Sequence, residues 1–271
     1  MVTPLQRREA LAHLQAKGLS GRAACRWAGL SRSVLRYPAR QAAVDQARLA
    51  QLRQASQQQP RFGYRRAGVL AGLSFKTAWR LWQIGHFSLE KPRRRKRRGT
   101  GTDVRPCRAE RPNHVWTYDL LHDQLADGKR FKTLSVLDEF TRECLAIHVG
   151  QSIRATDVVK VLAQVMARRG APTYLRSDNG SEFTATAVMR WLGEQQIGPA
   201  FIAPGRPWQN GYIESFHSRL RDECLNREWF HSGTEAAVVI ERWRQQYNTA
   251  RPHSSLGYRT PAQAAAAAAR P

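Results

Sequence analysis

The sequence predicts an α/β domain with a mixed five-stranded sheet, preceded by an all-helical basic region. From residue 112 onward, strand-like and helical segments follow one another in the order βββαβαβα, whereas the first ninety residues show helical patterns. The 271-residue chain carries a net charge of +23, and residues 1–100 hold 22 Lys and Arg against 3 acids. Residues 101–271 hold 22 against 18, so the charge belongs to the helical region.

A charge asymmetry of this kind indicates a polyanion-binding part joined to a second, ordinary globular part. Nucleic acid is the expected polyanion, because phosphate neutralisation and counterion release reward many Lys and Arg contacts. The sequence has no CxxC pair, zinc-ligand spacing, signal-peptide pattern or apolar run of about 18 residues. We therefore expect a cytoplasmic protein that neither spans a membrane nor carries disulfides. Its cysteines are Cys25, Cys107, Cys144 and Cys224.

Two short helical segments near the N-terminus have the outline of a helix-turn-helix. Residues 5–16 and 20–37 are helical in composition, with a turn at Gly29 and an N-cap at Ser31 before a segment that carries Arg32 and Arg36. The stretch "AGLSRSVLR" (28–36) is echoed by "AGLSFKTAWR" (71–80). We predict a helix-turn-helix DNA-binding module over 1–40 and a second helical DNA-binding module over 41–90. Generic helical hairpins with surface arginines are the alternative.

The segment "KPRRRKRRGTG" places seven bases in positions 91–98. Mutual repulsion disfavours a packed element there, so we expect a basic linker over 91–111 that lies along a phosphate backbone. A solubilising tether is the alternative.

The strand and helix pattern changes at Pro112. The expected strands are 114–123, 131–142, 143–150, 173–180 and 199–204, with a hairpin turn at "LADGKR", and the expected helices are 155–170, 182–198 and one from about Asn210. Helices on both faces of a mixed sheet follow from this order. A further helix is expected at 235–248, and no structure is assigned to the alanine-rich tail.

Three acids stand where this topology would bring them together. Asp119 lies mid-strand in an apolar stretch, Asp178 ends the fourth strand in "SDNG", and Glu214 is on the helix from Asn210. Converging carboxylates suit Mg²⁺ or Mn²⁺, and two such ions activate a nucleophilic oxygen and stabilise the leaving oxygen in phosphoryl transfer. Taken singly, an Asp in SDNG is commonly a turn former and a helical Glu a surface ion-pair partner.

The motifs resemble those of a transposase family with a retroviral-integrase-type core, the bacterial group named after insertion sequence three. "VWTYDL" resembles the first catalytic motif, "RSDNGSEF" the second and "NGYIESFHSRLRDECLN" the third. Thirty-five residues separate Asp178 from Glu214, and a basic residue, Arg221, follows seven positions later. "YNTARPHSSLGYRTP" resembles the C-terminal signature of the family, and "RFGYRR" its DNA-binding part.

The resemblance implies an RNase H-like catalytic core over 112–230 and a C-terminal helix and signature tail over 231–271. It implies a DDE transposase in which Asp119, Asp178 and Glu214 bind two Mg²⁺ or Mn²⁺ ions and catalyse DNA cleavage and strand transfer. The implied partners are the terminal inverted repeats and target DNA, further copies of the chain, and a frameshift fusion with an upstream reading frame. The predicted DNA contacts are Arg32, Arg36, Arg65, Arg66, Lys76, Arg80, Arg93, Arg94, Arg95, Lys96, Arg97, Arg98 and Arg221.

Two other functions are weighed against this one. A non-catalytic DNA-binding regulator would have a degenerate core, which the complete acid triple disfavours. A stand-alone RNase H-like nuclease would not need two helical DNA-binding modules. For Arg221 a DNA phosphate and an ion pair with Asp222 or Glu223 remain alternatives.

Overall fold

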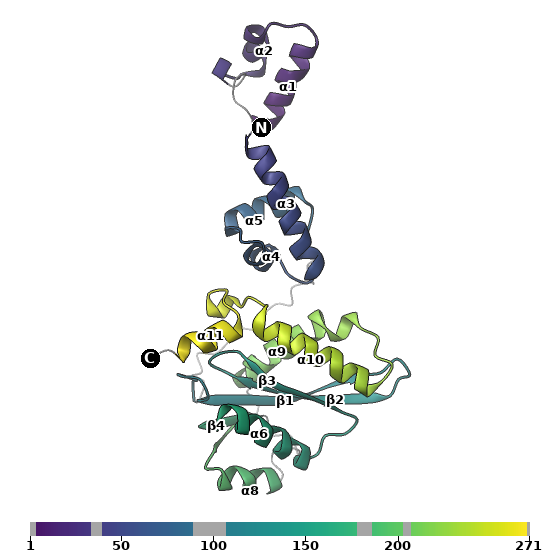
Figure 1. Cartoon of the computed structure of the whole chain (residues 1–271), viewed down its shortest axis with the longest axis vertical. Coiled ribbons are helices and arrows are strands. Elements are labelled where there is room, and N and C mark those ends of the chain that lie inside the picture. Colours follow the sequence, from purple (N-terminus) through teal and green to yellow (C-terminus); the bar gives the residue numbers. More distant parts are fainter. Residues whose placement is uncertain (1–3, 34–39, 89–106, 178–185, 203–206, 270–271) are drawn as a thin grey trace.

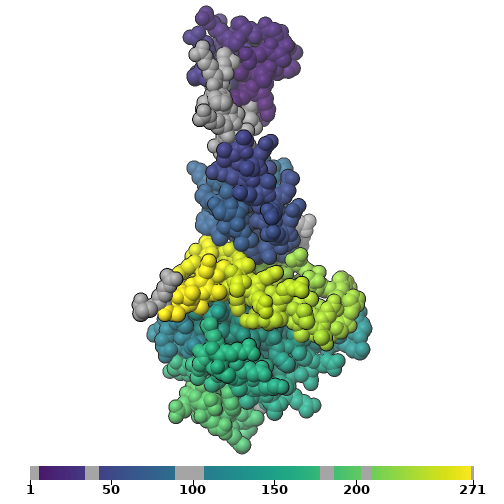
Figure 2. Space-filling view, in the orientation of Figure 1, coloured from purple at the N-terminus to yellow at the C-terminus, as the bar shows by residue number. Residues whose placement is uncertain are grey.

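The computed structural model describes residues 4–33, 40–88, 107–177, 186–202 and 207–269. The chain is elongated, with two helical units stacked on a larger α/β unit (Figure 1). The space-filling view shows the second helical unit seated on the C-terminal segment, which covers one side of the α/β unit (Figure 2).

The first helical unit pairs α1 (Pro4–Ala16) with α2 (Gly21–Ala28). Ser20 caps α2 by accepting a hydrogen bond from the Ala23 amide, and Gly29 ends it in the left-handed conformation (φ 64°). Leu11, Ala24 and Cys25 form a small buried core between the helices. The predicted helix after Ser31 falls largely on residues 34–39, outside the described residues.

The second helical unit contains α3 (Arg40–Gln58), α4 (Tyr64–Leu70) and α5 (Phe75–Ile84). The turn between α4 and α5 has Gly72 at φ 64° and Ser74 as the N-cap of α5, accepting from the Thr77 amide. Gly29 and Gly72 thus share the left-handed backbone at the same place in the sequence repeat. α4 and α5 form a helix-turn-helix that shares a buried core with α3.

The α/β unit is built on a five-stranded mixed sheet in the order β3-β2-β1-β4-β5. β1, β2 and β3 are antiparallel neighbours, whereas β4 runs parallel to β1 and β5 parallel to β4. The strands are β1 (Val115–Gln124), β2 (Arg130–Asp138), β3 (Cys144–Gly150), β4 (Tyr174–Ser177) and β5 (Gly198–Phe201). The predicted fold class and the order βββαβαβα are confirmed.

Helices cover both faces of the sheet (Figure 1). α6 (Ala155–Arg169) and α8 (Thr186–Glu194) pack on one face, and α9 (Gly211–Glu223) and α10 (Gly233–Thr249) on the other. Because side chains alternate along a strand, Trp116 and Tyr118 enter the α6 core while Thr117 reaches α9. The same alternation assigns Asp119 to the α9 face.

The alanine-rich tail, to which the sequence analysis assigned no structure, forms α11 (Pro261–Ala268). Thr260 accepts from the Gln263 amide while the Gln263 side chain accepts from the Thr260 amide, and Pro261 occupies the first turn. A capping box with Pro at the first helical position starts a helix even in a low-complexity sequence.

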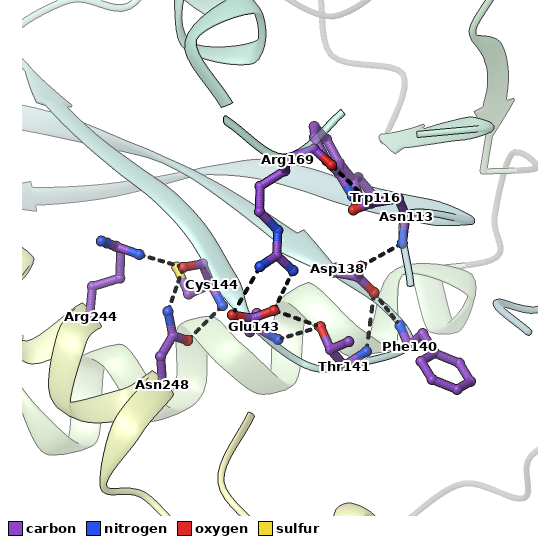
Figure 3. Close-up of polar contacts among 10 residues, drawn as sticks. All are labelled: Asn113, Trp116, Asp138, Phe140, Thr141, Glu143, Cys144, Arg169, Arg244 and Asn248. Carbon is purple, nitrogen blue, oxygen red and sulfur yellow. Dashed lines mark hydrogen bonds and ion pairs between the residues drawn. The ribbon is translucent and has the colours of Figure 1, made fainter. Parts of the chain in front are cut away.

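The tight turn between β2 and β3 is held by polar side chains (Figure 3). The buried Asp138 carboxylate accepts from the amides of Asn113, Phe140 and Thr141 at 2.8–3.1 Å. Asn248 of α10 bridges the other end of the turn, since its side chain both accepts from the Cys144 amide and donates to the Cys144 carbonyl, at 2.9 Å each. The turn therefore ties β2, β3 and α10 together.

Candidate active site

The strongest candidate site lies where α9 crosses β1. Three contacts along the helix match three positions along the strand: Thr117 Oγ1 donates to Asn210 Oδ1 at 2.9 Å just before α9 begins. One to two turns further on, His217 Nδ1 lies 3.7 Å from Asp119 Oδ2. At the end of the helix, Arg221 donates to the His122 carbonyl at 2.7 Å.

Asp119 lies on the α9 face of the sheet at the margin of the apolar core. Its side chain is 22% exposed, and Oδ1 accepts from the Leu120 amide at 2.7 Å. A carboxylate at the edge of a core can be reached by a cation from solvent.

His217 fills the space beside Asp119 in its neutral form. Burial, with a smaller contribution from the charge of Arg221, lowers the pKa of His217 to about 4. At neutral pH the contact with Asp119 is therefore not an ion pair. The buried His217 Nε2 has no hydrogen-bond partner within the described part of the chain.

Glu214 is exposed on the same side of α9 as these contacts. At 100° per residue, positions 210, 214, 217 and 221 fall within about 60° of helix circumference. Glu214 thus lies between the turn that contacts Thr117 and the turn that contacts Asp119. Helical periodicity therefore puts Glu214 on the side of α9 that contacts β1.

Asp178 lies outside the described residues, directly after β4 in the sequence. The last residues of β4 are firmly anchored: Arg176, 1% exposed, donates to Glu139 Oε1 at 2.8 Å and to the Cys107 carbonyl at 2.7 Å. A buried pair of this kind fixes the end of β4 beside β1, where Thr117 is the partner of Arg176.

The predicted DNA contacts are distributed unevenly over the structure. Arg32, Arg65 and Lys76 are exposed on the helical units. Arg66 is half-buried where the second unit meets the C-terminal segment, and Arg80 forms a bidentate pair with Asp45 at 2.6 and 2.7 Å. Those outside the described residues are Arg36, Arg93, Arg94, Arg95, Lys96, Arg97 and Arg98.

The two ion-pair alternatives for Arg221 are wrong. Asp222 pairs with Arg61 at the second helical unit, and Glu223 forms a buried pair with Arg251. Arg221 instead donates a hydrogen bond to the His122 carbonyl and remains half-exposed at the site.

Within the residues that the structure describes, no group of three His, Cys, Asp or Glu side chains is arranged to hold a metal ion. That set excludes Asp178. No helix of the described chain is long and apolar enough to cross a bilayer.

Sequence reasoning missed two arginines near this site, Arg142 and Arg219. Arg142, in the β2–β3 turn, and Arg219, on α9, line a cavity with Arg66 and Arg251. Arg142 gives no signal in the sequence, because its position depends on a turn whose backbone is set by Asp138. The position of Arg219, two residues from Arg221, places it on a different side of the helix, which the periodicity of α9 does reveal.

The integrase core domain family matches residues 109–207, and a second integrase core domain family matches residues 195–261. A 39.2 kDa protein of insertion element IS476 from Xanthomonas euvesicatoria is 41% identical over 271 residues, covering 98% of this chain and 78% of that protein. A 31.7 kDa protein of insertion element IS407 from Burkholderia multivorans is 39% identical over 254 residues, covering 92% and 91%. The transposase for insertion sequence element IS904 from Lactococcus lactis is 26% identical over 157 residues, 57% of this chain and 62% of that protein.

Among solved structures, the intasome of simian T-cell lymphotropic virus in complex with a PP2A regulatory subunit aligns with a TM-score of 0.51. Sequence identity is 16%, and the alignment covers 78% of this chain and 72% of that one. This likeness shows the fold: the α/β unit is an RNase H-like core of the integrase type. With the family matches and the close insertion-element relatives, it follows that the chain belongs to the family of insertion-element proteins that carry an integrase core domain.

Proposed function

We propose that the protein is a DNA transposase of the insertion-sequence-three group, and that it cleaves transposon ends and joins them to target DNA. Asp119, Asp178 and Glu214 are its catalytic carboxylates. The observation that carries the proposal is the docking of α9 on β1 around Asp119, which lies mid-strand in β1 next to the carboxyl-end edge where the parallel strand β4 stops. Ligands of α/β sheets collect at that edge.

Asp178 completes the set by its place in the chain. The parallel register pairs Thr117 with Arg176, and the two acids each follow these residues by two positions in the sequence. Neighbouring parallel strands end at the same edge of a sheet, so an acid directly after β4 belongs with Asp119.

The residues fit divalent cations. Asp119 and Glu214 offer partly or fully exposed carboxylate oxygens, which are the hard ligands that Mg²⁺ and Mn²⁺ prefer, and the nearby imidazole of His217 is neutral. Two bound ions would supply activation of the attacking oxygen and stabilisation of the leaving oxygen.

The reaction we propose has two steps of the same kind. A water oxygen attacks the phosphodiester at the transposon end, and the bond to the 3′ oxygen breaks to leave a 3′-hydroxyl. That hydroxyl then attacks a target phosphodiester, and the displaced oxygen leaves as a second 3′-hydroxyl. The chain contributes the carboxylates, while Arg221, half-exposed at the end of the same helix face, neutralises a DNA phosphate beside them.

The remaining parts follow from the same proposal. The helix-turn-helix of α4 and α5, the basic residues of the first helical unit and the linker 91–111 bind the terminal inverted repeats. The module boundaries at 40, 90, 111 and 230, action as an oligomer or as a frameshift fusion, and a cytoplasmic location are part of this proposal.

The test is a cleavage and strand-transfer assay with DNA that carries the element's terminal repeats, in Mg²⁺ or Mn²⁺. Asp119→Asn, Asp178→Asn and Glu214→Gln should each lower both reactions by at least about 100-fold, because even partners of metal ligands cost 10- to 100-fold when removed. Binding to the same DNA in EDTA should be retained.

The chain offers matched controls. Asp123 lies on β1 four residues from Asp119, and its Oδ1 accepts from the next amide at 2.8 Å, as that of Asp119 does at 2.7 Å. Asp123→Asn and Glu228→Gln, the latter at an exposed site, should retain activity. Full activity of the three test variants would contradict the assignment of the triad. If the unaltered protein bound DNA but did not cleave it, even with the upstream frame's product added, the result would favour the non-catalytic regulator.

A further inference from the structure

A second, strongly basic cavity lies on the side of α9 that faces away from the candidate active site. Gly211, Tyr212, Ser215 and Arg219 line it from α9, and on a helical wheel these positions are about 100–200° from Asn210. The cavity has a volume of about 310 Å³. It is therefore separate from the carboxylate face that carries Glu214.

Four arginines from separate parts of the chain line this cavity. Arg66 comes from α4, Arg142 from the β2–β3 turn, Arg219 from α9 and Arg251 from the segment after α10. Glu223 neutralises Arg251 through a buried ion pair. Within the described part of the chain, the residues that line the cavity include no Asp or Glu. The cavity thus holds an excess of positive charge.

The charges are close enough to act on one another. Burial and the charge of Arg251 lower the pKa of Arg66 to about 10. Like charges gathered at one cavity repel one another, and a bound anion would relieve that repulsion. Hydroxyl groups of Ser215, Ser254 and Ser255 on the cavity wall add neutral donors.

Arg142 shows that the chain accepts backbone strain at this cavity. Its φ is 63°, in the left-handed region that Gly and Asn adopt far more readily than Arg. The turn is fixed by Asp138, whose carboxylate accepts from the amides of Phe140 and Thr141 (Figure 3). The Asp138 carbonyl accepts from the Arg142 amide at 2.9 Å. Strained residues that their surroundings hold in place cluster at functional sites.

The side chain of Arg142 is also preoriented. Its guanidinium stacks on the Tyr212 ring, 3.7 Å from the ring centroid, and donates to the Glu139 carbonyl. Planar guanidinium groups that are held in place bind phosphate oxygens in pairs, with little conformational entropy left to lose.

We propose that this cavity binds a backbone phosphate of DNA, held by Arg142 and Arg219 of the core and Arg66 of the second helical unit. The inference rests on the proposed function for its ligand class, since a DNA-processing protein meets phosphodiesters at high local concentration. A phosphate bound here lies between the second helical unit and the core. It would connect DNA bound by the helix-turn-helix to α9, because Arg66 and Arg219 would contact the same phosphate.

The test compares an Arg142→Gly/Arg219→Gln variant with an Arg190→Gln/Arg242→Gln control of equal charge. Arg190 and Arg242 are exposed on α8 and α10, away from the cavity. Glycine suits the positive φ at position 142, so the turn should remain folded, which the melting temperature checks. Binding is measured in EDTA on a duplex with the element's terminal sequence, so that failure of the catalytic proposal leaves the readout intact.

We expect the cavity variant to bind the duplex at least about 10-fold more weakly than the control, and the slope of log affinity against log salt to fall by about 0.9 per lost phosphate contact. In a series of duplexes that each carry one neutral methylphosphonate, we expect one position at which the substitution weakens binding by the unaltered protein but not binding by the cavity variant. Equal affinity and slope for cavity variant and control would overturn the proposal. The proposal would also be overturned if the cavity variant bound the duplex as the control does but was no longer stabilised against heating by inorganic phosphate. That result would assign the cavity to a free anion.

Discussion

At the scale of single residues, the half-buried His253 at the basic cavity makes stability depend on pH. Burial, followed by the nearby arginines, lowers the pKa of His253 to about 3, and its ring lies edge-on to Tyr247 with centroids 4.7 Å apart. The groups that lower it are Arg251, Arg66, Arg142 and Arg219. In the unfolded chain the pKa returns to about 6.5, so the unfolded state binds the proton more readily.

The contribution of His253 to the free energy of unfolding is therefore fully present above a pH of about 6.5 and is lost as the pH falls from there toward 3. Between about pH 7.5 and 5 the loss is up to about 2 kcal/mol. His253→Gln should flatten the urea-unfolding free energy over this range, whereas His231→Gln, at an exposed position, should not. An unchanged pH profile in the His253 variant would show that the ring is not protonated on unfolding.

Residues also mark the limit of what the sequence can predict. Asp119 is identifiable because a carboxylate is disfavoured in the middle of an apolar strand unless it has a partner or a function. In the structure it lies on the face of the sheet that α9 covers. Asp138 and Glu139 were equally available as acids, but one organises a turn and the other neutralises Arg176. No local pattern distinguishes these roles, because they depend on contacts across the sheet.

At the scale of elements, the docking of α10 on β3 depends on Asn248. β3 is an edge strand whose pairing with β2 is irregular at Val136 and Leu137, and the backbone of Cys144 is satisfied there by the Asn248 side chain. Arg244 adds a donor to the Cys144 carbonyl at 2.8 Å. In this way the helix takes the place of a neighbouring strand.

Asn248→Ala should therefore destabilise the core by about 2–3 kcal/mol, since it leaves the buried Cys144 amide without an acceptor. Chemical denaturation measures the loss. Gln246→Ala, exposed on the same helix, is the control and should change stability by less than about 0.5 kcal/mol. Equal stability of both variants would mean that water or a shift of the strand satisfies the amide.

The order and type of elements were predictable because periodicity and turn residues are local. α6 was expected at 155–170 and spans Ala155–Arg169, ending at Gly170 with φ 81°. α11 was missed although its Thr-x-x-Gln capping box and Pro261 were visible in the sequence. The stacking of the second helical unit on the C-terminal segment was not predictable, because its contacts join residues that are far apart in the chain.

At the scale of the whole molecule, polar and aromatic side chains join the second helical unit to the core, and Arg251 also lies 5.7 Å from the centroid of the Phe62 ring. Arg61 Nε donates to Asp222 Oδ1 at 2.8 Å, and the rings of Phe75 and Tyr258 lie 4.7 Å apart. An exposed ion pair contributes about 0.2–1 kcal/mol and an aromatic pair about 0.5–1.5 kcal/mol. These two pairs together contribute about 0.7–2.5 kcal/mol to the closed arrangement in Figure 1.

An Arg61→Ala/Tyr258→Ala variant should shift this balance by a factor of about 3–60 toward separated units, since 1.4 kcal/mol is tenfold. Small-angle scattering should show a larger radius of gyration, and a fluorescence pair on α3 and α10 a longer distance. Arg53→Ala/Trp27→Ala removes an exposed arginine and a 78% exposed ring elsewhere, and should leave both values unchanged. Because Arg66 reaches the basic cavity from this unit, bound DNA should restore the compact state in the variant; if DNA leaves the units apart, no phosphate bridges them.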